Sequence, residues 1–298
     1  MQEQSIAWGA TGSGKSLFDV TNNVGPRPTI YLRFTDLSLL PADANIYDYG
    51  QYNAVSSIIF RDSQIRGGTL SIGTYFLQAA PTVGLTNNLA LRATITLSCD
   101  VGGSQVSLPS YLHNNLFRFG SATFNNATSK GTFEIKDNLF DTVTLSGNAG
   151  NQGYTNSYNG YYNTTQLPGA THSVTLTAAD YKIGPLGGYY YPTNGASGGL
   201  TNLINAGSRT ADLAGLYHYT TSIGLTKETN SIVDCGYHYV ATDANGNPLD
   251  FDGDGIPDYL EDYNGNGVFD PGIDTPSQQD LPEPFIDFRP LPDRKSVV

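Results

Sequence analysis

The feature that most restricts the fold of this chain is an aspartate or asparagine that recurs through its first half. Each copy lies beside a short apolar segment, and successive copies are 26, 26, 27, 23 and 21 residues apart. The copies are Asp36, Asp62, Asn88, Asn115, Asn138 and Asn159. Periods of about 20–50 residues are typical of solenoids, in which each repeat buries its apolar face only by stacking on its neighbours. The sequence therefore predicts a solenoid.

The apolar segments indicate strands. They are short and end at Gly, Asn or Asp, as in Ile-Tyr-Leu-Arg-Phe at residues 30–34 and Thr-Val-Thr-Leu at residues 142–145. An Asx residue tolerates a left-handed turn and its side chain can bond to the next coil, so stacked copies would form an internal ladder. We therefore expect an all-β chain built on a parallel β-helix. An antiparallel β-sandwich with unrelated loops is the alternative.

The repeats resemble the coils of right-handed parallel β-helices of the pectate-lyase-like superfamily. The resemblance is carried by Asn-Asn-Leu-Phe at residues 114–117, Asp-Asn-Leu-Phe at 137–140 and Tyr-Asn-Gly-Tyr at 158–161. It covers residues 30–185 and implies a right-handed solenoid from a large secreted bacterial protein. By that resemblance we expect an extracellular or cell-surface location.

The residues after the repeats differ in character. Residues 186–242 are rich in tyrosine and in turn residues, and a solenoid needs an end that covers its open strands, so we expect final coils and a C-terminal cap here. The stretch holds two near-copies of Gly-x-Tyr-His-Tyr, centred on His218 and His238. No acidic partner for either histidine is evident from the sequence. We therefore interpret both as packing positions and not as a metal site.

Residues 250–261 read Asp-Phe-Asp-Gly-Asp-Gly-Ile-Pro-Asp-Tyr-Leu-Glu and match a calcium-binding loop. Positions 1, 3, 5, 9 and 12 are acidic, position 6 is glycine, and position 7 can contribute its backbone carbonyl. Calcium takes about six to eight oxygen ligands, and this spacing wraps them around one point. The predicted ligands are Asp250, Asp252, Asp254, Ile256, Asp258 and Glu261. An acidic disordered linker is the alternative.

A second loop follows directly. Its predicted ligands are Asp262, Asn264, Asn266, Val268, Asp270 and Asp274. Position 12 is Ile273 instead of an acid, so we expect a weaker site or ligands shared with the first loop. The tandem loops, over residues 243–275, resemble thrombospondin type 3-like calcium repeats. That resemblance implies that calcium orders a segment that would otherwise repel itself, and makes it a stiff connector between modules.

The charge of the chain agrees with a calcium segment and argues against other partners. Acids outnumber bases 27 to 15, the net charge is −12, and residues 243–274 contain no Lys or Arg. Nucleic acid and anionic membranes require basic patches, so neither is an expected partner. No apolar run is long enough to span a membrane, and the first residues lack the pattern of a signal peptide. The apolar surroundings of Cys99 and Cys235 predict buried thiols.

A phosphate-binding pattern occurs near the start of the chain. Gly-Ala-Thr-Gly-Ser-Gly-Lys-Ser at residues 9–16 has the required spacing. The chemistry also needs a preceding buried strand and a following helix, and the downstream sequence breaks at Asn, Gly and Pro before a helix could form. We therefore expect no nucleotide site.

Polysaccharide chemistry is a stronger alternative, because many parallel β-helices act on sugars. Lyases of that fold need a basic residue beside calcium, and hydrolases need paired carboxylates. The acids on the coils are Asp36, Asp62, Asp137 and Asp141. Two of them, Asp36 and Asp62, fall on the expected ladder register, where a structural role is the default, and no acid pair stands out. We therefore favour a structural role over an enzyme.

The expected organisation is a lead-in or first coil at residues 1–29, β-helix coils at 30–185, final coils and cap at 186–242, calcium repeats at 243–275 and a Pro-rich linker at 276–298. Residues 293–298 correspond to codons that resemble a sequencing adapter, so we expect the natural chain to continue differently. The predicted function is a calcium-binding structural or adhesive module of a secreted or cell-surface protein. Its expected partner is a polysaccharide or another surface protein, and a polysaccharide lyase or glycoside hydrolase is the alternative function.

Overall fold

The structure is a computed structural model of the chain. It describes residues 4–8, 17, 28–39, 45–48, 55–73, 81–99, 108–126, 131–147 and 154–274, with only the backbone for a few strand residues among them. The phosphate-loop-like residues 9–16 and the Pro-rich residues 276–298 lie outside these ranges.

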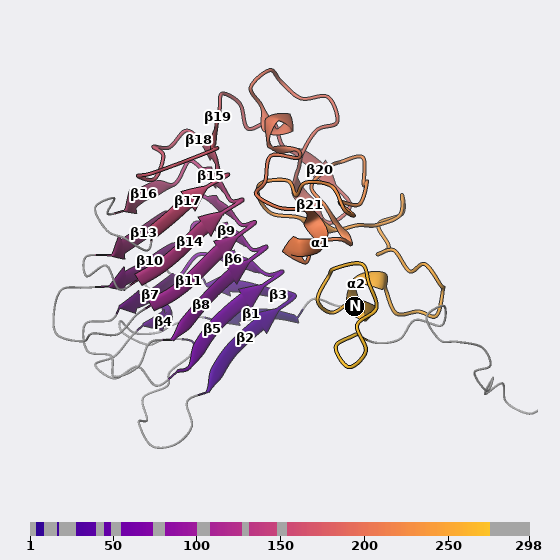
Figure 1. The fold of residues 1–298 in the computed structure, drawn as a ribbon, viewed down its shortest axis with the longest axis horizontal. Helices are drawn as coiled ribbons and strands as arrows, with labels where there is room; N and C mark the ends of the chain where they lie inside the picture. Colours follow the sequence, from indigo (N-terminus) through magenta and orange to yellow (C-terminus); the bar gives the residue numbers. More distant parts are fainter. Residues whose placement is uncertain are drawn as a thin grey trace, which may run out of the picture.

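Three parallel sheets form the sides of a solenoid (Figure 1). Sheet A contains β1 (Gln4–Trp8), β3 (Thr35–Leu39), β6 (Gln64–Arg66), β9 (Leu89–Leu91), β12 (Leu116–Arg118), β15 (Leu139–Asp141), β18 (Gly160–Tyr162) and β19 (Val174–Leu176). Sheet B contains β4 (Asn45–Asp48), β7 (Thr69–Gly73), β10 (Thr94–Cys99), β13 (Ser121–Asn126) and β16 (Thr144–Gly147). Sheet C contains β2 (Thr29–Arg33), β5 (Ser57–Arg61), β8 (Thr82–Thr86), β11 (Leu108–His113), β14 (Gly131–Lys136) and β17 (Tyr154–Ser157). The chain passes from sheet C to A to B and then starts the next coil, which confirms a parallel β-helix.

Alternating burial along the strands builds the core of the solenoid. In β10, Ile95, Leu97 and Cys99 are buried and the residues between them point outward. Aromatic rings also stack from coil to coil: the centroids of Phe117 and Phe140 are 5.2 Å apart. Each coil thus adds inward side chains to one continuous apolar core. Cys99 and Cys235 are both buried thiols, as expected.

An asparagine ladder occupies the corner where sheet C passes into sheet A. Asn88, Asn115, Asn138 and Asn159 are buried there. The backbone N–H of each of the first three donates to the side-chain Oδ1 of the next, over 2.9, 3.0 and 2.9 Å. The side-chain amides repeat the same connection at 3.0, 2.9 and 3.0 Å. The predicted ladder is confirmed for these four residues, and it satisfies polar groups that would otherwise be buried without partners.

Asp36 and Asp62 are not members of this ladder, so their predicted register is wrong. The ladder positions of the first coils are Thr35 and Ser63. The N–H of Thr35 donates to Ser63 Oγ, and the N–H of Ser63 donates to Asn88 Oδ1, both over 3.2 Å. Asp36 lies one residue after the ladder position and Asp62 one residue before it. A hydroxyl performs the same acceptor role as an Asx oxygen, which is why the Asx pattern alone is misleading in these coils.

After β19 the chain leaves the coils and returns along the side of the solenoid (Figure 1). This returning segment contains β20 (Lys182–Gly184), β21 (Gly187–Tyr190), the 3-10 helix η1 (Leu200–Leu203), α1 (Ala211–Ala214), β22 (Tyr219–Thr220), β23 (Tyr239–Val240) and α2 (Asp258–Glu261). Its strands form two antiparallel pairs, β20 with β21 and β22 with β23, whereas the coil strands are parallel. Among the described helices, none has the length and apolar character needed to cross a membrane.

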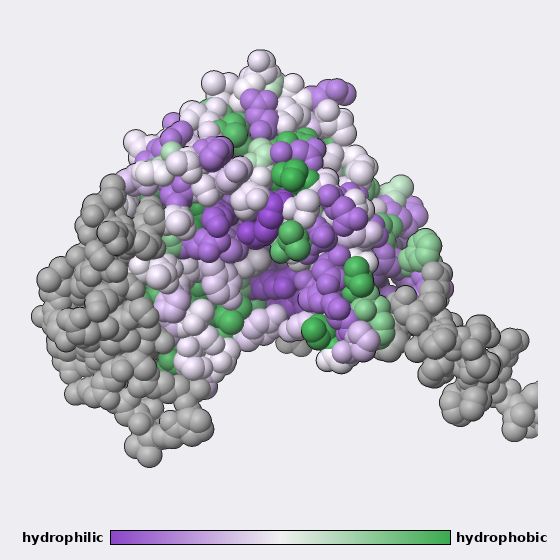
Figure 2. All heavy atoms as spheres, in the orientation of Figure 1, coloured by the Kyte–Doolittle hydropathy of each residue, from purple (hydrophilic) through white to green (hydrophobic). Residues whose placement is uncertain are grey.

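Polar residues on the outside of the ladder corner hold the returning segment. Asp62, Asn87, Asn114 and Asp137 all have left-handed backbones, with φ of 51–60°. Their side chains reach the returning segment or its anchors: for example, the N–H of His238 donates to Asn87 Oδ1 over 2.7 Å. The exposed side chains along this junction are mainly hydrophilic (Figure 2), while beneath them leucines of sheet A pack against buried tyrosines and leucines of the returning segment. The corner therefore has two structural roles. The asparagine ladder inside it connects successive coils, and the polar residues outside it bind the returning segment.

Candidate calcium site

Loop 1, which we define as residues 250–261, is organised around its first aspartate. Asp250 Oδ1 accepts the N–H of Gly253 over 2.8 Å, and Oδ2 accepts that of Gly255 over 3.0 Å. The two glycines have φ of 75° and 95°, and a Cβ at either would meet nothing within 4 Å. Glycine is thus required here for its left-handed backbone and not for lack of space.

Two further aspartates converge on Asp250. Asp252 Oδ1 accepts the N–H of Asp254 over 3.2 Å, and Asp254 Oδ1 accepts that of Ile256 over 2.7 Å. One oxygen from each of Asp250, Asp252 and Asp254 lies within 4.8 Å of the others. Like charges at this distance repel one another, and a cation between them would convert the repulsion into attraction.

Glu261, the last residue of α2, approaches the same group from the protein side. It exposes only 7% of its surface, and its Oε1 has no hydrogen-bond partner. Burial, together with the negative charges of Asp252 and Asp254, raises the pKa of Glu261 to about 7. A buried carboxylate oxygen without a partner is unfavourable. Glu261 is not one of the three residues whose oxygens lie within 4.8 Å, but it is close enough for their charges to act on it, so it is the candidate for a further ligand.

Asp258 connects loop 1 to the rest of the returning segment. Its Oδ1 accepts the N–H of Phe251 over 2.7 Å, and Lys227 Nζ donates to its Oδ2 over 3.3 Å. His218 Nδ1 lies 3.7 Å from the same Oδ2. Burial alone would raise the pKa of Asp258, but the neighbouring His218 and the hydrogen bond from the Phe251 N–H lower it. Asp258 thus has protein partners of its own, in contrast to the unpaired oxygen of Glu261.

Loop 2, which we define as residues 262–274, repeats the hydrogen bonds of loop 1 at equivalent positions. The N–H groups of Gly265 and Gly267, the glycines at positions 4 and 6, donate to the two carboxylate oxygens of Asp262. Asn264 Oδ1 accepts the N–H of Asn266 over 3.0 Å, and Asn266 Oδ1 accepts that of Val268 over 2.7 Å. The two loops therefore share one backbone arrangement.

The side chains of loop 2 nevertheless satisfy one another. Asp270 Oδ2 accepts the amide Nδ2 of Asn264 over 2.6 Å and that of Asn266 over 2.8 Å. The two oxygens of Asp274 accept the backbone N–H groups of Tyr263 and Asp270, over 2.9 and 2.7 Å. At positions 3 and 5, loop 2 therefore has the amides of Asn264 and Asn266 where loop 1 has carboxylates. These amides donate hydrogen bonds to Asp270, whose charge a cation would otherwise balance.

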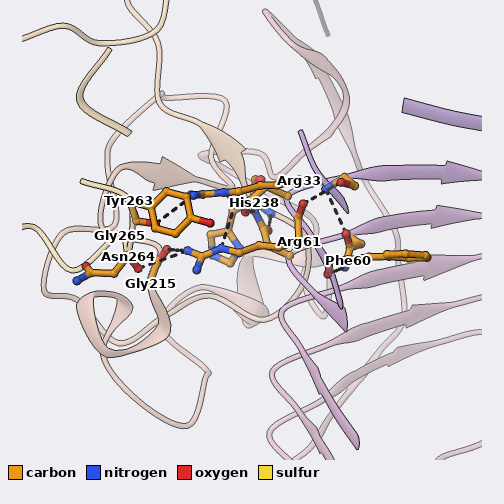
Figure 3. A network of polar contacts seen from close by, with 12 residues as sticks. Arg33, Phe60, Arg61, Gly215, His238, Tyr263, Asn264 and Gly265 are labelled. Carbon is orange, nitrogen blue, oxygen red and sulfur yellow. Dashed lines mark hydrogen bonds and ion pairs between the residues drawn. The ribbon is translucent and has the colours of Figure 1, made fainter. Parts of the chain in front are cut away.

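Loop 2 also contacts the first coils of the solenoid (Figure 3). Arg33 Nη1 donates to the carbonyl of Tyr263 over 3.1 Å, and Arg61 Nη2 donates to that of Asn264 over 3.4 Å. The Nε atoms of both arginines pair with Asp62 Oδ2, at 2.9 and 3.1 Å. The Arg33 guanidinium also lies 4.7 Å from the centroid of the Tyr263 ring. These contacts join residues of the first coils to the end of the returning segment.

His218 lies between the two loops. Its Nε2 is 3.0 Å from Asp262 Oδ2, and its Nδ1 is within 4 Å of Asp258. Burial lowers the pKa of His218, but the nearby carboxylates of Asp258 and Asp262 outweigh that effect and raise it. His238 likewise lies 3.5 Å from Glu228. Both histidines therefore have acidic neighbours, which corrects the expectation from the sequence. The tyrosines beside them, Tyr219, Tyr237 and Tyr239, are buried.

The partners of the loops are what sequence reasoning missed. Arg33 and Arg61 are the last residues of β2 and β5, and they meet an acidic segment about 200 positions later in the chain. A usable signal was present: two arginines end consecutive strands of one sheet, while residues 243–274 carry no base. Charge complementarity would have suggested that the two regions lie close together, although the arginines donate to backbone carbonyls of the segment and not to its acids.

The donor set of loop 1 fits a calcium ion. Every candidate side-chain ligand is a carboxylate, and calcium prefers such hard oxygen donors, including a glutamate that can bind through both oxygens. Ile256 adds only a backbone carbonyl to this set. The unpaired Oε1 of Glu261 is the group that an ion would satisfy. In loop 2 the amides of Asn264 and Asn266 lower the negative charge available to an ion.

The acids considered for sugar chemistry all have protein partners. Asp36 pairs with Arg66 at 3.1 Å, and Asp62 pairs with the two arginines described above. Asp137 accepts hydrogen bonds from the backbone and the hydroxyl of Ser208, over 2.7 and 2.8 Å. Asp141 accepts the hydroxyl of Tyr181 over 2.9 Å and pairs with an arginine of β12 at 3.0 Å. Each acid therefore has a structural role in these contacts.

Comparisons of the chain with protein-family models, with curated proteins and with solved structures give no match. The fold assignment accordingly rests on the strand pairing, and the candidate site rests on its own geometry.

Proposed function

We propose that this chain is a calcium-binding structural or adhesive module of a secreted or cell-surface protein, in which calcium in loop 1 fixes the returning segment against the β-helix. The observation that carries the proposal is the buried, unpaired Oε1 of Glu261, a residue on which the negative charges of the loop aspartates act. A group of this kind destabilises the calcium-free protein and becomes favourable once a cation satisfies it.

Only one helix, α2, separates the proposed ion from the solenoid. Asp258 and Glu261 both belong to α2, and Tyr259 lies between them. The Tyr259 ring packs edge-on against Phe34, which follows β2 in the first coil, with centroids 5.1 Å apart. An ion bound by Glu261 would hold α2, and α2 would hold the returning segment on the solenoid. Calcium then stiffens an existing contact and takes no part in a reaction.

The wider role follows from chemistry and from the resemblance of the tandem loops to thrombospondin type 3-like repeats. A site of this type binds calcium at the concentrations found outside cells, which agrees with a secreted or cell-surface location. The net charge of −12 favours a neutral or basic partner, such as an uncharged polysaccharide or another surface protein. A polysaccharide lyase or glycoside hydrolase is the less favoured alternative, because the coil acids serve in structural contacts.

Isothermal titration with calcium tests the proposal. The wild-type chain is expected to bind calcium, and Glu261→Gln is expected to weaken the binding at least about tenfold, because it removes a charged ligand. Asp243→Asn is the matched control: it is the same kind of change in the same segment, at an exposed turn where Asp243 accepts the N–H groups of Asn245 and Asn247. Thermal unfolding without calcium verifies that both variants fold. Absence of binding by the folded wild type, or equal losses in the two variants, contradicts the proposal.

A further inference from the structure

The outward face of sheet B carries a regular array of hydroxyl groups. On β7, β10, β13 and β16, the outward residues at the first and third strand positions are Thr or Ser in every case. They form two rows that run across the four strands: Thr69, Thr94, Ser121 and Thr144, and Ser71, Thr96, Thr123 and Ser146. Thr144 and Ser146 are exposed and the other six are partly exposed.

The positions of the hydroxyls are fixed by the strand pairing. Adjacent strands pair without a shift in register through all four coils, so the rows run straight. Strand geometry sets spacings of about 4.8 Å between coils and about 6.6 Å along a strand. Hydroxyls on neighbouring coils already contact each other: Ser121 Oγ lies 3.2 Å from Thr94 Oγ1, and Ser146 Oγ lies 2.9 Å from Thr123 Oγ1. Threonine side chains are also stiff because they branch at Cβ.

The chemistry of the array restricts what could bind it. The chain has a net charge of −12, yet none of these eight positions is charged and none is aromatic. Charge complementarity therefore favours a neutral partner. Pockets for small ligands are concave and lined by apolar and aromatic side chains, whereas this surface is the outer side of a sheet and is lined by hydroxyls. The matching partner is neutral, repeats in two dimensions, and both donates and accepts hydrogen bonds.

We propose that the outward face of sheet B binds the surface of ice. Each hydroxyl donates one hydrogen bond and accepts others, as does each water molecule of the ice lattice. The two spacings of the array, about 4.8 and 6.6 Å, repeat in two directions, as do the water molecules on a face of a crystal. Stiff side chains in a fixed register lose little conformational entropy on adsorption. The inference is independent of calcium binding, because sheet B lies away from the two loops (Figure 1).

The test measures the gap between the melting and freezing temperatures of a single ice crystal in a solution of the full chain with calcium. The wild type is expected to open such a gap and to shape the crystal into facets. Thr96→Tyr and Thr123→Tyr, at the centre of the array, are expected to lose most of the gap, because a bulky ring lifts the lattice off the neighbouring hydroxyls. The control is Thr132→Tyr, an exposed position on β14 of sheet C, which is expected to retain it.

Thermal unfolding establishes that each variant is folded. The proposal is overturned if the folded wild type produces no gap, or if Thr132→Tyr loses as much of it as Thr96→Tyr. It is also overturned if the wild type pellets with crystalline cellulose or chitin, loses that binding in Thr96→Tyr, and shows no gap in ice, since the array then recognises a polysaccharide. Glu261→Gln should retain the gap, so failure of the calcium proposal is distinguishable from failure of this one.

Discussion

Loops 1 and 2 adopt the same backbone but balance their acidic side chains differently. In both, the first aspartate accepts the N–H groups of two glycines, and the side chains at positions 3 and 5 each accept an N–H two residues later. Loop 1 has aspartates at positions 3 and 5, and Glu261, on which their charges act, has one buried oxygen without a partner. Loop 2 has asparagines there, and their amides donate to Asp270. The two loops thus share a backbone conformation, and the residues at positions 3 and 5 determine whether the loop needs a cation to balance its charge.

The two loops also differ in their surroundings. Loop 2 is held by Arg33 and Arg61 of the first coils, and its second residue, Tyr263, packs under the Arg33 guanidinium. The second residue of loop 1, Phe251, is 81% exposed. Loop 2 is therefore held by the solenoid, and its side chains have hydrogen-bond partners within the protein. Loop 1 is more exposed, and we expect its order to depend on an ion.

The largest expected effect comes from removing the first aspartate of each loop. Asp250→Ala should weaken calcium binding at least about 100-fold, because a charged ligand and the acceptor for two N–H groups are both lost. Asp262→Ala should leave the affinity of loop 1 within about tenfold but lower the calcium-free stability by about 1–3 kcal/mol, since buried donors lose their acceptor. Calcium titration and thermal unfolding measure the two effects. Equal loss of calcium affinity in both variants would show that the loops form one shared site.

Changing loop 2 toward loop 1 should exchange their properties. In Asn264→Asp with Asn266→Asp, Asp270 loses its two amide donors and gains two like charges nearby. The variant should bind one more calcium ion than the wild type and should unfold at a lower temperature in the absence of calcium. Stoichiometry from titration and melting curves with and without a chelator measure this. An unchanged stoichiometry together with an unchanged melting temperature would mean that the asparagines do not determine the difference.

Removing an anchor should affect stability more than calcium binding. Arg61→Ala takes away the donor to loop 2 and one of the partners of the buried Asp62, so a destabilisation of about 1–3 kcal/mol is expected. Arg66→Ala is the control: its ion pair with Asp36 is partly exposed, and its loss should change stability by about 0–1 kcal/mol. Denaturant unfolding measures both. A loss of calcium affinity in Arg61→Ala as large as that of Glu261→Gln would contradict the division between anchor and ion site.

The smallest expected effect is a dependence on pH. The pKa of Glu261 is raised from 4.5 to about 7, so the folded, calcium-free protein holds this proton more tightly than the unfolded chain. The contribution of Glu261 to stability should therefore decrease as the pH rises from about 4.5 to about 7. Calcium competes with the same proton, so its affinity should fall as the pH drops below 7. Calcium titrations at pH 6 and pH 8 measure this change in affinity. Glu261→Gln should make the difference between the two affinities smaller. If the difference is unchanged in that variant, another group causes it.

The predictable parts of this protein are those fixed by local sequence. Strand alternation and the recurring Asx residue identify the coils, and Asn88 and its three successors lie where the ladder predicts. Thr35 and Ser63 escaped that pattern because hydroxyls take the same role with a different residue type. The spacing of acids and glycines in loop 1 likewise requires no knowledge of the fold. The partners of the loops are not local: Arg61 meets Asn264 only because the chain turns back after the last coil, and no periodicity encodes that path.

Hydrogen exchange of the two loops, with calcium and with a chelator, tests the central claim most directly. The N–H groups compared are those of Gly253, Gly255 and Ile256 in loop 1 and those at the same positions of loop 2. The loop 1 amides should exchange rapidly without calcium and become protected when it is added, whereas the loop 2 amides should be protected in both conditions. Equal responses of the two loops to calcium, or no response of loop 1, would contradict this claim.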